Sequence, residues 1–322
     1  MGNAHLRILL SVRAVEAARA ATRAVRPASP EKSAIRLRRR HGVLRSVLVA
    51  LTAFLCGRRP VRGAGLSAAA RALTAEDRAR VDELFALAFN APTVEAEEAA
   101  WSELLEGYGA VPEVVARAAS NRGNSRARQG RFVEALADYG KSIELAPGEV
   151  DAYLNRGATY EALGRLEDAI TDYNRVLGLN VNDPAAWNNR GNALMGLGRY
   201  EDARDSFKSA LGISGPQQFA FAAVNLNLAE YQLGNDGAAI KDLRSTLARY
   251  ADAFPDARAA YALMLWESGE RVKAEEEWDR ATMVDPRYRS LEWVTKFRRW
   301  PPRLRAILQR FSQTTGVKVR AR

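Results

Sequence analysis

Cysteine and histidine are nearly absent from this sequence, and the few that occur lie near its start. The 322 residues include one cysteine, Cys56, and two histidines, His5 and His41. Beyond Cys56 the chain therefore has no thiolate nucleophile, no imidazole base, no disulfide and no zinc site of the usual ligand type. A Ser-His-Asp triad is excluded there for the same reason. Carboxylates, lysines, tyrosines and hydroxyl groups are the reactive groups that are left.

A glycine-rich phosphate-binding loop is also missing, because the glycines of the chain recur in register with a repeat. Two acidic clusters offer carboxylates, one formed by Glu95, Glu97 and Glu98 and the other by residues 275–277. Acids so close in sequence point around a helix and do not converge on one point. We therefore interpret both clusters as solvated helix faces. The sequence predicts no enzyme activity, no cofactor and no metal site.

What the sequence does contain is a repeat with a period of 34 residues. Asn-Arg-Gly occurs at residues 121–123, 155–157 and 189–191. The same spacing relates Gly130, Gly164 and Gly198, Ala135, Ala169 and Ala203, and the aromatic residues Tyr139, Tyr173 and Phe207. Small and aromatic residues at three- and four-residue steps on both sides of a central glycine predict two amphipathic helices joined by a tight turn. Each unit is expected to be a helical hairpin.

Small residues have a packing role in this hairpin. Gly123, Gly157 and Gly191 are expected to let the two helices approach closely, with an alanine of the second helix facing them. The large aromatic residues then fill the remaining space. The sequence therefore predicts a core built from matched small and large side chains.

This pattern resembles the tetratricopeptide repeat, a helical hairpin of 34 residues. The resemblance is strongest from Ala116 to about Ser214, and two further units follow with drift, marked by Gly234 and by Gly269. It implies an all-α fold, a right-handed superhelical solenoid of about five helical hairpins with N- and C-terminal capping helices. We divide the chain into a leader (1–72), N-terminal capping helices (73–113), five repeat units (114–290), C-terminal capping helices (291–313) and a basic tail (314–322).

The two caps have their own sequence signals. Residues 74–77, Thr-Ala-Glu-Asp, look like a capping box at the start of a helix, and a second helical stretch covers residues 93–108. At the other end, Leu291, Trp293, Val294 and Phe297 form an apolar face. Trp300-Pro301-Pro302 breaks this helix, and a new one follows with Leu304, Ile307, Leu308 and Phe311. We expect these helices to shield the last repeat.

Charge is distributed unevenly along the chain. The net charge is +10, yet residues 1–71 hold 15 basic and two acidic side chains, and residues 296–322 hold nine basic and no acidic ones. The body, residues 72–295, has 24 basic and 36 acidic side chains, a net charge of −12. An acidic body repels polyanions, so nucleic acid is not the expected partner. The basic C-terminus is a candidate for contact with an anionic partner, namely a membrane surface, an acidic protein or RNA, but we favour a capping helix with a charged solvent face.

The leader has the composition of a two-part targeting signal. Residues 1–40 are rich in Arg, Ala and Ser and nearly free of acid, as in an organelle transit peptide. Residues 47–56 form an apolar run that is too short to span a bilayer but suits a signal-peptide core. Small-residue cleavage sites follow at residues 68–72. This layout predicts the thylakoid lumen of the chloroplast; arginines after the apolar run keep a thylakoid membrane anchor open, and a mitochondrial location is the other alternative.

Asparagine recurs where the resemblance implies a concave groove lined by the first helix of each hairpin. A carboxamide has two donors and two acceptor lone pairs, so a row of them can bind the backbone of an extended peptide. The alternative is that these side chains satisfy only the neighbouring backbone or solvent. The predicted peptide-binding residues are Asn121, Asn124, Asn155, Asn188, Asn189, Asn192 and Asn225.

Two further features of the repeats bear on the groove. The carboxylate clamp of some family members needs basic residues where this chain has Ser120, Ala185 and Asn189, so a clamp is not expected. The arginine of each Asn-Arg-Gly tripeptide is expected to pair with an aspartate of the second helix. The predicted pairs are Arg122 with Asp138, Arg156 with Asp172, and Arg190 with Asp205.

The two-part leader, the repeats and the closing Arg-Arg-Trp-Pro-Pro together resemble the thylakoid-lumen tetratricopeptide repeat proteins of plants and algae. That resemblance implies a non-catalytic scaffold that binds a protein or peptide in its groove and serves the assembly or stability of a photosynthetic complex. A mitochondrial repeat adaptor and an RNA-associated plastid factor are the two alternatives.

Overall fold

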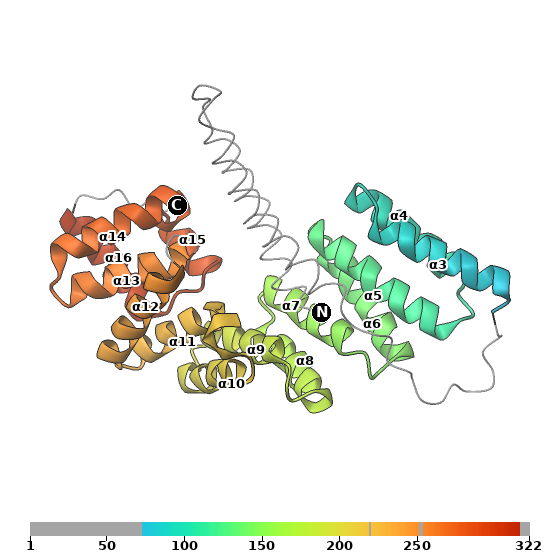
Figure 1. Ribbon diagram of the computed structural model, residues 1–322, viewed down its shortest axis with the longest axis horizontal. Helices are drawn as coiled ribbons and strands as arrows, with labels where there is room; N and C mark the ends of the chain where they lie inside the picture. The colour runs from blue at the N-terminus through green and yellow to red at the C-terminus, as the bar shows by residue number, and fades with distance from the viewer. Residues whose placement is uncertain (1–72, 219, 251–253, 316–322) are drawn as a thin grey trace, which may run out of the picture. The chain divides into compact units, whose positions relative to one another are not determined.

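The computed structural model describes residues 73–218, 220–250 and 254–315. Within these ranges the elements are fourteen α-helices and one 3-10 helix, with no strand, as the sequence predicts (Figure 1). The leader, with its predicted transit peptide, apolar run and cleavage sites, lies outside the described residues, as does most of the basic tail. The helices fall into two compact units, divided between Leu163 and Gly164.

The first unit contains five described helices. Its first helix, α3, begins with the predicted capping box, in which the Thr74 hydroxyl accepts from the Asp77 amide and the Asp77 carboxylate accepts from the Thr74 amide. The helices are α3 (Ala75–Phe89), α4 (Val94–Gly107), α5 (Pro112–Arg128), α6 (Phe132–Leu145) and α7 (Val150–Ala162).

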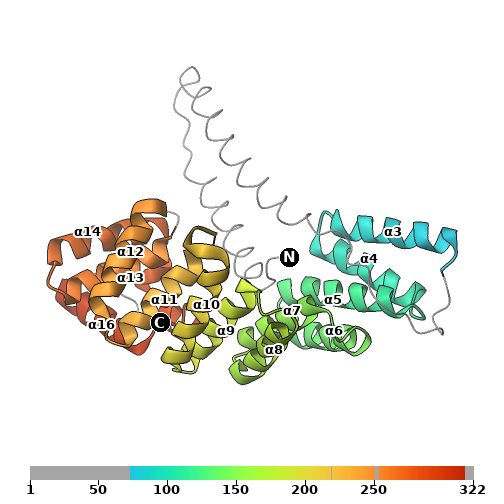
Figure 2. The ribbon, with the colours of Figure 1, turned by 60° about the horizontal axis from the view of Figure 1, so that its bottom comes forward.

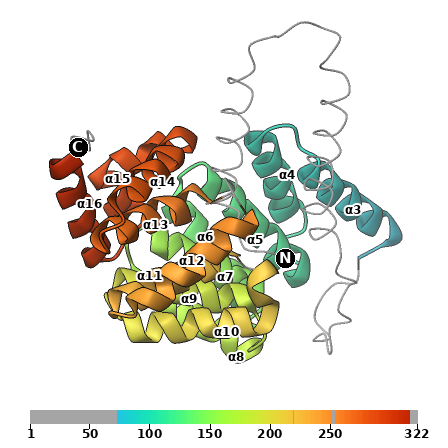
Figure 3. The ribbon, with the colours of Figure 1, turned by 60° about the vertical axis from the view of Figure 1, so that its left-hand side comes forward.

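The second unit holds the remaining described helices. From α8 to α14, each helix packs against the next one in the chain (Figures 2 and 3). They are α8 (Leu166–Leu179), α9 (Pro184–Gly196), α10 (Tyr200–Gln218), α11 (Ala220–Gln232), α12 (Asp236–Tyr250), α13 (Pro255–Glu267), α14 (Arg271–Val284), the 3-10 helix η2 (Pro286–Arg289), α15 (Leu291–Lys296) and α16 (Pro302–Thr315). None of the described helices combines the length and the apolar character needed to cross a bilayer.

Five glycines in left-handed conformation mark the turns of the five predicted hairpins. Their φ angles lie between 76° and 95°, a region that other residues rarely adopt. In four of these turns the amide after the glycine donates to a carbonyl five residues earlier, at 2.9 to 3.0 Å, which is the Schellman bond that closes a helix. The glycines are Gly130, Gly164, Gly198, Gly234 and Gly269. The two drifted repeats therefore end their first helices as the first three do.

The glycine of the Asn-Arg-Gly tripeptide makes room for an aromatic ring. A Cβ on Gly123 would lie 2.8 Å from the ring of Tyr139, and one on Gly191 would lie 2.5 Å from the ring of Phe207. Both rings are fully buried, as is Ala135 in the same hairpin as Tyr139. The prediction that these glycines permit close packing is confirmed for Gly123 and Gly191. The residue they accommodate is the aromatic one.

The N-terminal helices close the first repeat, as expected. Leu84 and Phe85 of α3 and Trp101 of α4 form one buried cluster with Val114 and other residues of α5. Trp101 is completely buried and its ring lies 5.3 Å from that of Phe85 in an edge-on arrangement. The apolar end of the repeats is thereby covered.

The C-terminal helices depart from the expected cap in two ways. Phe297 is expected on the apolar face, but it lies just after the end of α15 and is 68% exposed. The chain then turns at Arg299, whose φ of 51° is left-handed. The second helix, α16, packs against α13 of the last repeat and also reaches α11 of the repeat before it. The cap therefore covers first helices from two repeats.

Candidate peptide-binding site

Two asparagine pairs connect first helices of neighbouring repeats. In the first unit, Nδ2 of Asn155 on α7 donates to Oδ1 of Asn124 on α5 at 2.8 Å. In the second unit, Nδ2 of Asn225 on α11 donates to Oδ1 of Asn192 on α9 at 2.9 Å. Three of the four side chains are half-buried, and Asn155 is buried. The structure thus brings together four of the seven predicted residues, as two equivalent bridges.

Each bridge fixes which amide atoms face outward. Oδ1 of Asn124 also accepts from the hydroxyl of Tyr139 at 2.9 Å, so both of its lone pairs are used and its Nδ2 donors are what it can still offer. Oδ1 of Asn192 is likewise engaged by Asn225. The chain therefore presents carboxamides in a set orientation, and a preset orientation lowers the entropy lost on binding.

Both bridges involve an asparagine three positions after the tripeptide asparagine. Asn124 and Asn192 hold this position in the first and third repeats, whereas Ala158 holds it in the second. Nδ2 of Asn188 donates to Oδ1 of Asn189 beside it at 3.2 Å. The two bridges could have been predicted from the sequence, because the spacing from Asn124 to Asn155 nearly equals that from Asn192 to Asn225.

The other predicted asparagines have different surroundings. Asn188 and Asn189 are 1% and 0% exposed, so the structure holds them inside the fold and away from solvent. Nδ2 of Asn121 donates to the backbone carbonyl of Arg117 on its own helix at 2.9 Å. This last contact is the local one that the alternative interpretation of the asparagines expects.

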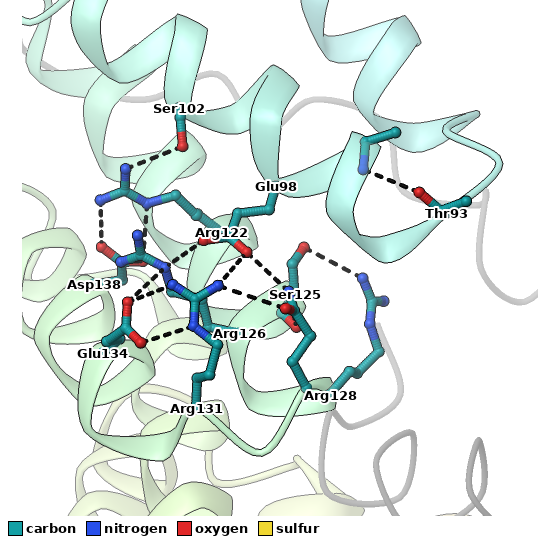
Figure 4. Close-up of polar contacts among 12 residues, drawn as sticks. Thr93, Glu98, Ser102, Arg122, Ser125, Arg126, Arg128, Arg131, Glu134 and Asp138 are labelled. Atoms are coloured by element: carbon teal, nitrogen blue, oxygen red, sulfur yellow. Dashed lines mark hydrogen bonds and ion pairs between the residues drawn. The ribbon is translucent and has the colours of Figure 1, made fainter.

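Arg122 forms the predicted ion pair with Asp138. Its Nη2 lies 2.7 Å from Oδ1 and its Nε 3.0 Å from Oδ2 of the buried aspartate, which is the two-pronged geometry that suits a guanidinium (Figure 4). Arg126 contacts the same carboxylate at 2.8 Å, and Nη1 of Arg122 also donates to the hydroxyl of Ser102 on α4 at 3.3 Å. The arginine of the first tripeptide therefore has a structural role.

The same network contains an acid that the sequence analysis placed in solvent. Glu98 of α4 lies 2.9 Å from Nε of Arg126 and 2.6 Å from Nη1 of Arg131, and Gln129 donates to it at 2.8 Å (Figure 4). Burial raises the pKa of the Glu98 carboxyl, but the hydrogen bonds from Arg126 and Gln129 and the charge of Arg131 outweigh it, so the pKa lies below its ordinary value. Four arginines in all, Arg122, Arg126, Arg128 and Arg131, thus connect α4 to α5 and α6.

The expectation of solvated acidic faces was therefore wrong for Glu97 and Glu98 of the first cluster and for Glu277 of the second. Glu97 has 21% of its side chain exposed and pairs with Arg128 of α5. Glu98 has 14% of its side chain exposed, and Glu277 of α14, with 12%, pairs with the buried Arg258 of α13. Their neighbours Glu275 and Glu276 are exposed, as predicted. A helix that packs on a neighbour turns some acids inward, and a sequence without its tertiary partners does not show which.

The third predicted ion pair is absent from the described contacts. Arg190 donates to Oδ1 of Asn174 at 2.9 Å and to the hydroxyl of Ser206 at 2.7 Å, whereas Asp205 pairs with its neighbour Arg204. Asp205 lies one residue earlier in its repeat than Asp138 does, so it points to a different side of its helix. Burial lowers the pKa of Arg190. The second pair, Arg156 with Asp172, stays a prediction, because its two residues belong to different compact units.

The described residues contain no group of three or more His, Cys, Asp and Glu side chains arranged to hold a metal ion. The arginines of the Figure 4 network are matched by carboxylates, so they offer little free charge to an anion. Asn124 and Asn192 use their side-chain oxygens in the bridges and can offer their Nδ2 donors to a ligand.

Comparison with known proteins agrees with this architecture. A tetratricopeptide repeat model matches residues 114–180, and another tetratricopeptide repeat model matches residues 154–218. Residues 114–218 therefore match tetratricopeptide repeats. A comparison with curated proteins found no significant match.

Solved tetratricopeptide repeat structures share the fold of this chain at low sequence identity. A tetratricopeptide repeat protein from Parabacteroides merdae is 19% identical with a TM-score of 0.57, over 73% of this chain and 93% of that one. The pilF protein of Pseudomonas aeruginosa is 18% identical with a TM-score of 0.50, over 63% of this chain and 91% of that one. These likenesses concern the fold alone.

Proposed function

We propose that this tetratricopeptide repeat protein is a non-catalytic scaffold that binds an extended segment of a partner protein. The observation that carries the proposal is the pair of asparagine bridges, Asn124 with Asn155 and Asn192 with Asn225. A carboxamide whose oxygen is engaged presents N–H donors to a peptide carbonyl, and the same contact is available for any peptide sequence. Backbone binding of this kind suits a scaffold that holds an unfolded segment.

The test uses peptides selected from a random 12-residue phage-displayed library on the recombinant full chain. Each bridging oxygen is then removed by Asn124→Ala or Asn192→Ala, and affinity is measured by fluorescence polarisation. Loss of one or two hydrogen bonds is expected to weaken binding about tenfold, since each contributes roughly 0.5–1.5 kcal/mol. The matched control is Asn182→Ala at an exposed loop position, which is expected to bind as the unaltered chain does. Selection of no peptides, or equal affinity for all three variants, would contradict the proposal.

A narrower proposal concerns where the scaffold works. The two-part composition of residues 1–72 supports import into the thylakoid lumen, where the protein would serve the assembly or stability of a photosynthetic complex. Fusion of residues 1–75 to a fluorescent protein, followed by import into isolated chloroplasts and mitochondria, tests this. A shortened, protease-protected product inside thylakoids is expected. A fusion protected only in mitochondria would favour the mitochondrial adaptor.

A further inference from the structure

The segment that follows the repeats is basic and yet closely paired. Residues 298–311, here called the C-terminal segment, contain five arginines and no acid. Sequence analysis left an anionic partner or a solvated helix face as its two explanations. The structure shows that acids of the repeat body itself are the anionic partner for three of these arginines, Arg298, Arg303 and Arg310.

Arg298 anchors the start of the segment on the last repeat. Its Nε donates at 2.8 Å to Asp256, the second residue of α13, and its Nη2 also contacts that carboxylate. The indole of Trp300 and the hydroxyl of Tyr288 donate to the same aspartate at 3.1 and 3.0 Å. Asp256 is 7% exposed, so this carboxylate is a buried hub with several donors.

Arg303 connects the segment to the repeat before the last one. Its guanidinium lies 2.6 Å from both carboxylate oxygens of Asp236, at the start of α12, and over the ring of Tyr231 at 4.1 Å. It also donates to the Tyr231 carbonyl at 2.6 Å, while its own amide donates to the side chain of Gln232 at the end of α11. Arg303 thereby contacts both helices that flank the turn between α11 and α12.

Arg310 forms an ion pair with the next repeat along the chain. Its Nη2 lies 2.7 Å from both oxygens of Glu267, the last residue of α13. Arg303 and Arg310 are seven residues apart, which places them on the same side of α16. The helix therefore aligns two arginines with the corresponding ends of α11 and α13.

The adjoining side of α16 is apolar and buried. Four side chains at i, i+3, i+4 and i+7 are at most 1% exposed, the pattern of an amphipathic helix lying in a groove. Phe311 lies 5.9 Å from the ring of Trp266 on α13 and 5.2 Å from that of Trp278 on α14. The four residues are Leu304, Ile307, Leu308 and Phe311.

We propose that the face of α11 and α13 is an interaction site for a basic amphipathic helix, and that the C-terminal segment is its built-in occupant. A partner helix with apolar side chains at i, i+3, i+4 and i+7 and arginines seven residues apart exchanges with it. Tethering gives the internal segment a high effective concentration, so an outside helix competes only when it binds tightly or when the segment is released. This site does not depend on the asparagine bridges.

Two features favour exchange of the C-terminal segment with a partner helix over its permanent attachment to the repeats. The pairs made by Arg303 and Arg310 are open to solvent, with 32% to 52% of each arginine and 37% to 42% of each acid exposed, and such pairs are replaced at little cost. The body has a net charge of −12, which attracts a basic helix, and Asp236 and Glu267 are the acids that pair with arginines at this face.

The test releases the segment and supplies it from outside. In the full chain, Leu304→Asp with Leu308→Asp places two charges on the buried side of α16, whereas Ala306→Asp with Gln309→Asp adds the same charge at exposed positions. The probe is a fluorescein-labelled synthetic peptide of residues 298–315, with binding followed by polarisation. The first variant is expected to bind at least tenfold more tightly than the unaltered chain, and the second variant to match the unaltered chain.

Charge reversal then checks the specificity of the site. Asp236→Lys with Glu267→Lys, added to the released variant, is expected to weaken peptide binding about tenfold. A peptide carrying Arg303→Glu and Arg310→Glu is expected to restore tight binding to this charge-reversed variant.

The inference is overturned if the released variant loses its cooperative helical melt, which would make the segment part of the core. It is equally overturned if that variant stays folded without gaining affinity, or if charge reversal has no effect. Asn192→Ala should leave peptide binding unchanged, which separates this test from that of the asparagine bridges.

Discussion

Replacing Gly191 with alanine tests how closely the helices of the third repeat approach each other. The added Cβ would lie 2.5, 2.7 and 2.8 Å from three atoms of the Phe207 ring, all shorter than a normal contact. Because Phe207 is fully buried, the ring can move only by displacing its neighbours. Overpacking of this kind costs about 1–3 kcal/mol.

An opposing effect favours the alanine variant. Alanine stabilises a helix interior by about 1 kcal/mol relative to glycine. At Gly191 the steric cost is expected to win, with a net loss of about 1–2 kcal/mol. The control is Gly212→Ala in α10 of the same hairpin, where nothing lies within 4 Å of the added Cβ, so this variant should be more stable than the unaltered chain.

Thermal melts followed by circular dichroism measure both variants. A change of 1 kcal/mol shifts the Tm by about 2–4 °C for a chain of this size, so the two variants should differ by several degrees in opposite directions. Adding Phe207→Leu to Gly191→Ala should recover part of the loss by shortening the ring. If Gly191→Ala raises the Tm as Gly212→Ala does, the close approach inferred for this hairpin is refuted.

Three further predictions concern the turns and the arginine network. Gly234→Ala should cost about 1–2 kcal/mol because its φ is 90°, whereas Gly237→Ala in the following helix should not destabilise; urea unfolding compares them. Arg122→Leu should lower stability by about 1–3 kcal/mol, since the buried Asp138 keeps only one arginine partner, and an equal midpoint in urea would show that the pair is unimportant. The pKa of Glu98 is lowered from 4.5 in the folded state, so its stabilising contribution is complete above that pH and is lost as pH falls through the folded pKa. Glu98→Gln should therefore flatten the decline of Tm below about pH 4.5, and an unchanged acid profile would contradict this.

Much of the repeat fold was predictable because its signals are local. Gly130 and its counterparts end helices through their own φ angles, and Gly123 and Gly191 match aromatic residues 16 positions later in the same hairpin. Such signals depend on short sequence separations, so the 34-residue period is enough to reveal them. The capping box at Thr74 is local in the same sense.

Contacts between hairpins were harder to predict. The pairing of Asn124 with Asn155 depends on how one first helix lies against the next, and the inward turn of Glu98 depends on α4 docking on α5. Asp205 shows the limit most clearly, because a shift of one residue on a helix turns a side chain by about 100° and gives it another partner.

The sequence by itself determined the helical hairpins, their number and their turns, because glycine conformation and residue size act within one repeat. It also determined that the chain beyond residue 56 has no thiol or imidazole chemistry. Only the tertiary structure decided the partners of the charged and polar groups. Arg303 meets Asp236 across 67 residues and Arg298 meets Asp256 across 42, and no periodicity in the chain records distances of that kind. Arg298, Arg303 and Arg310 therefore looked free in the sequence, whereas in the fold they pair with acids of the protein's own repeats.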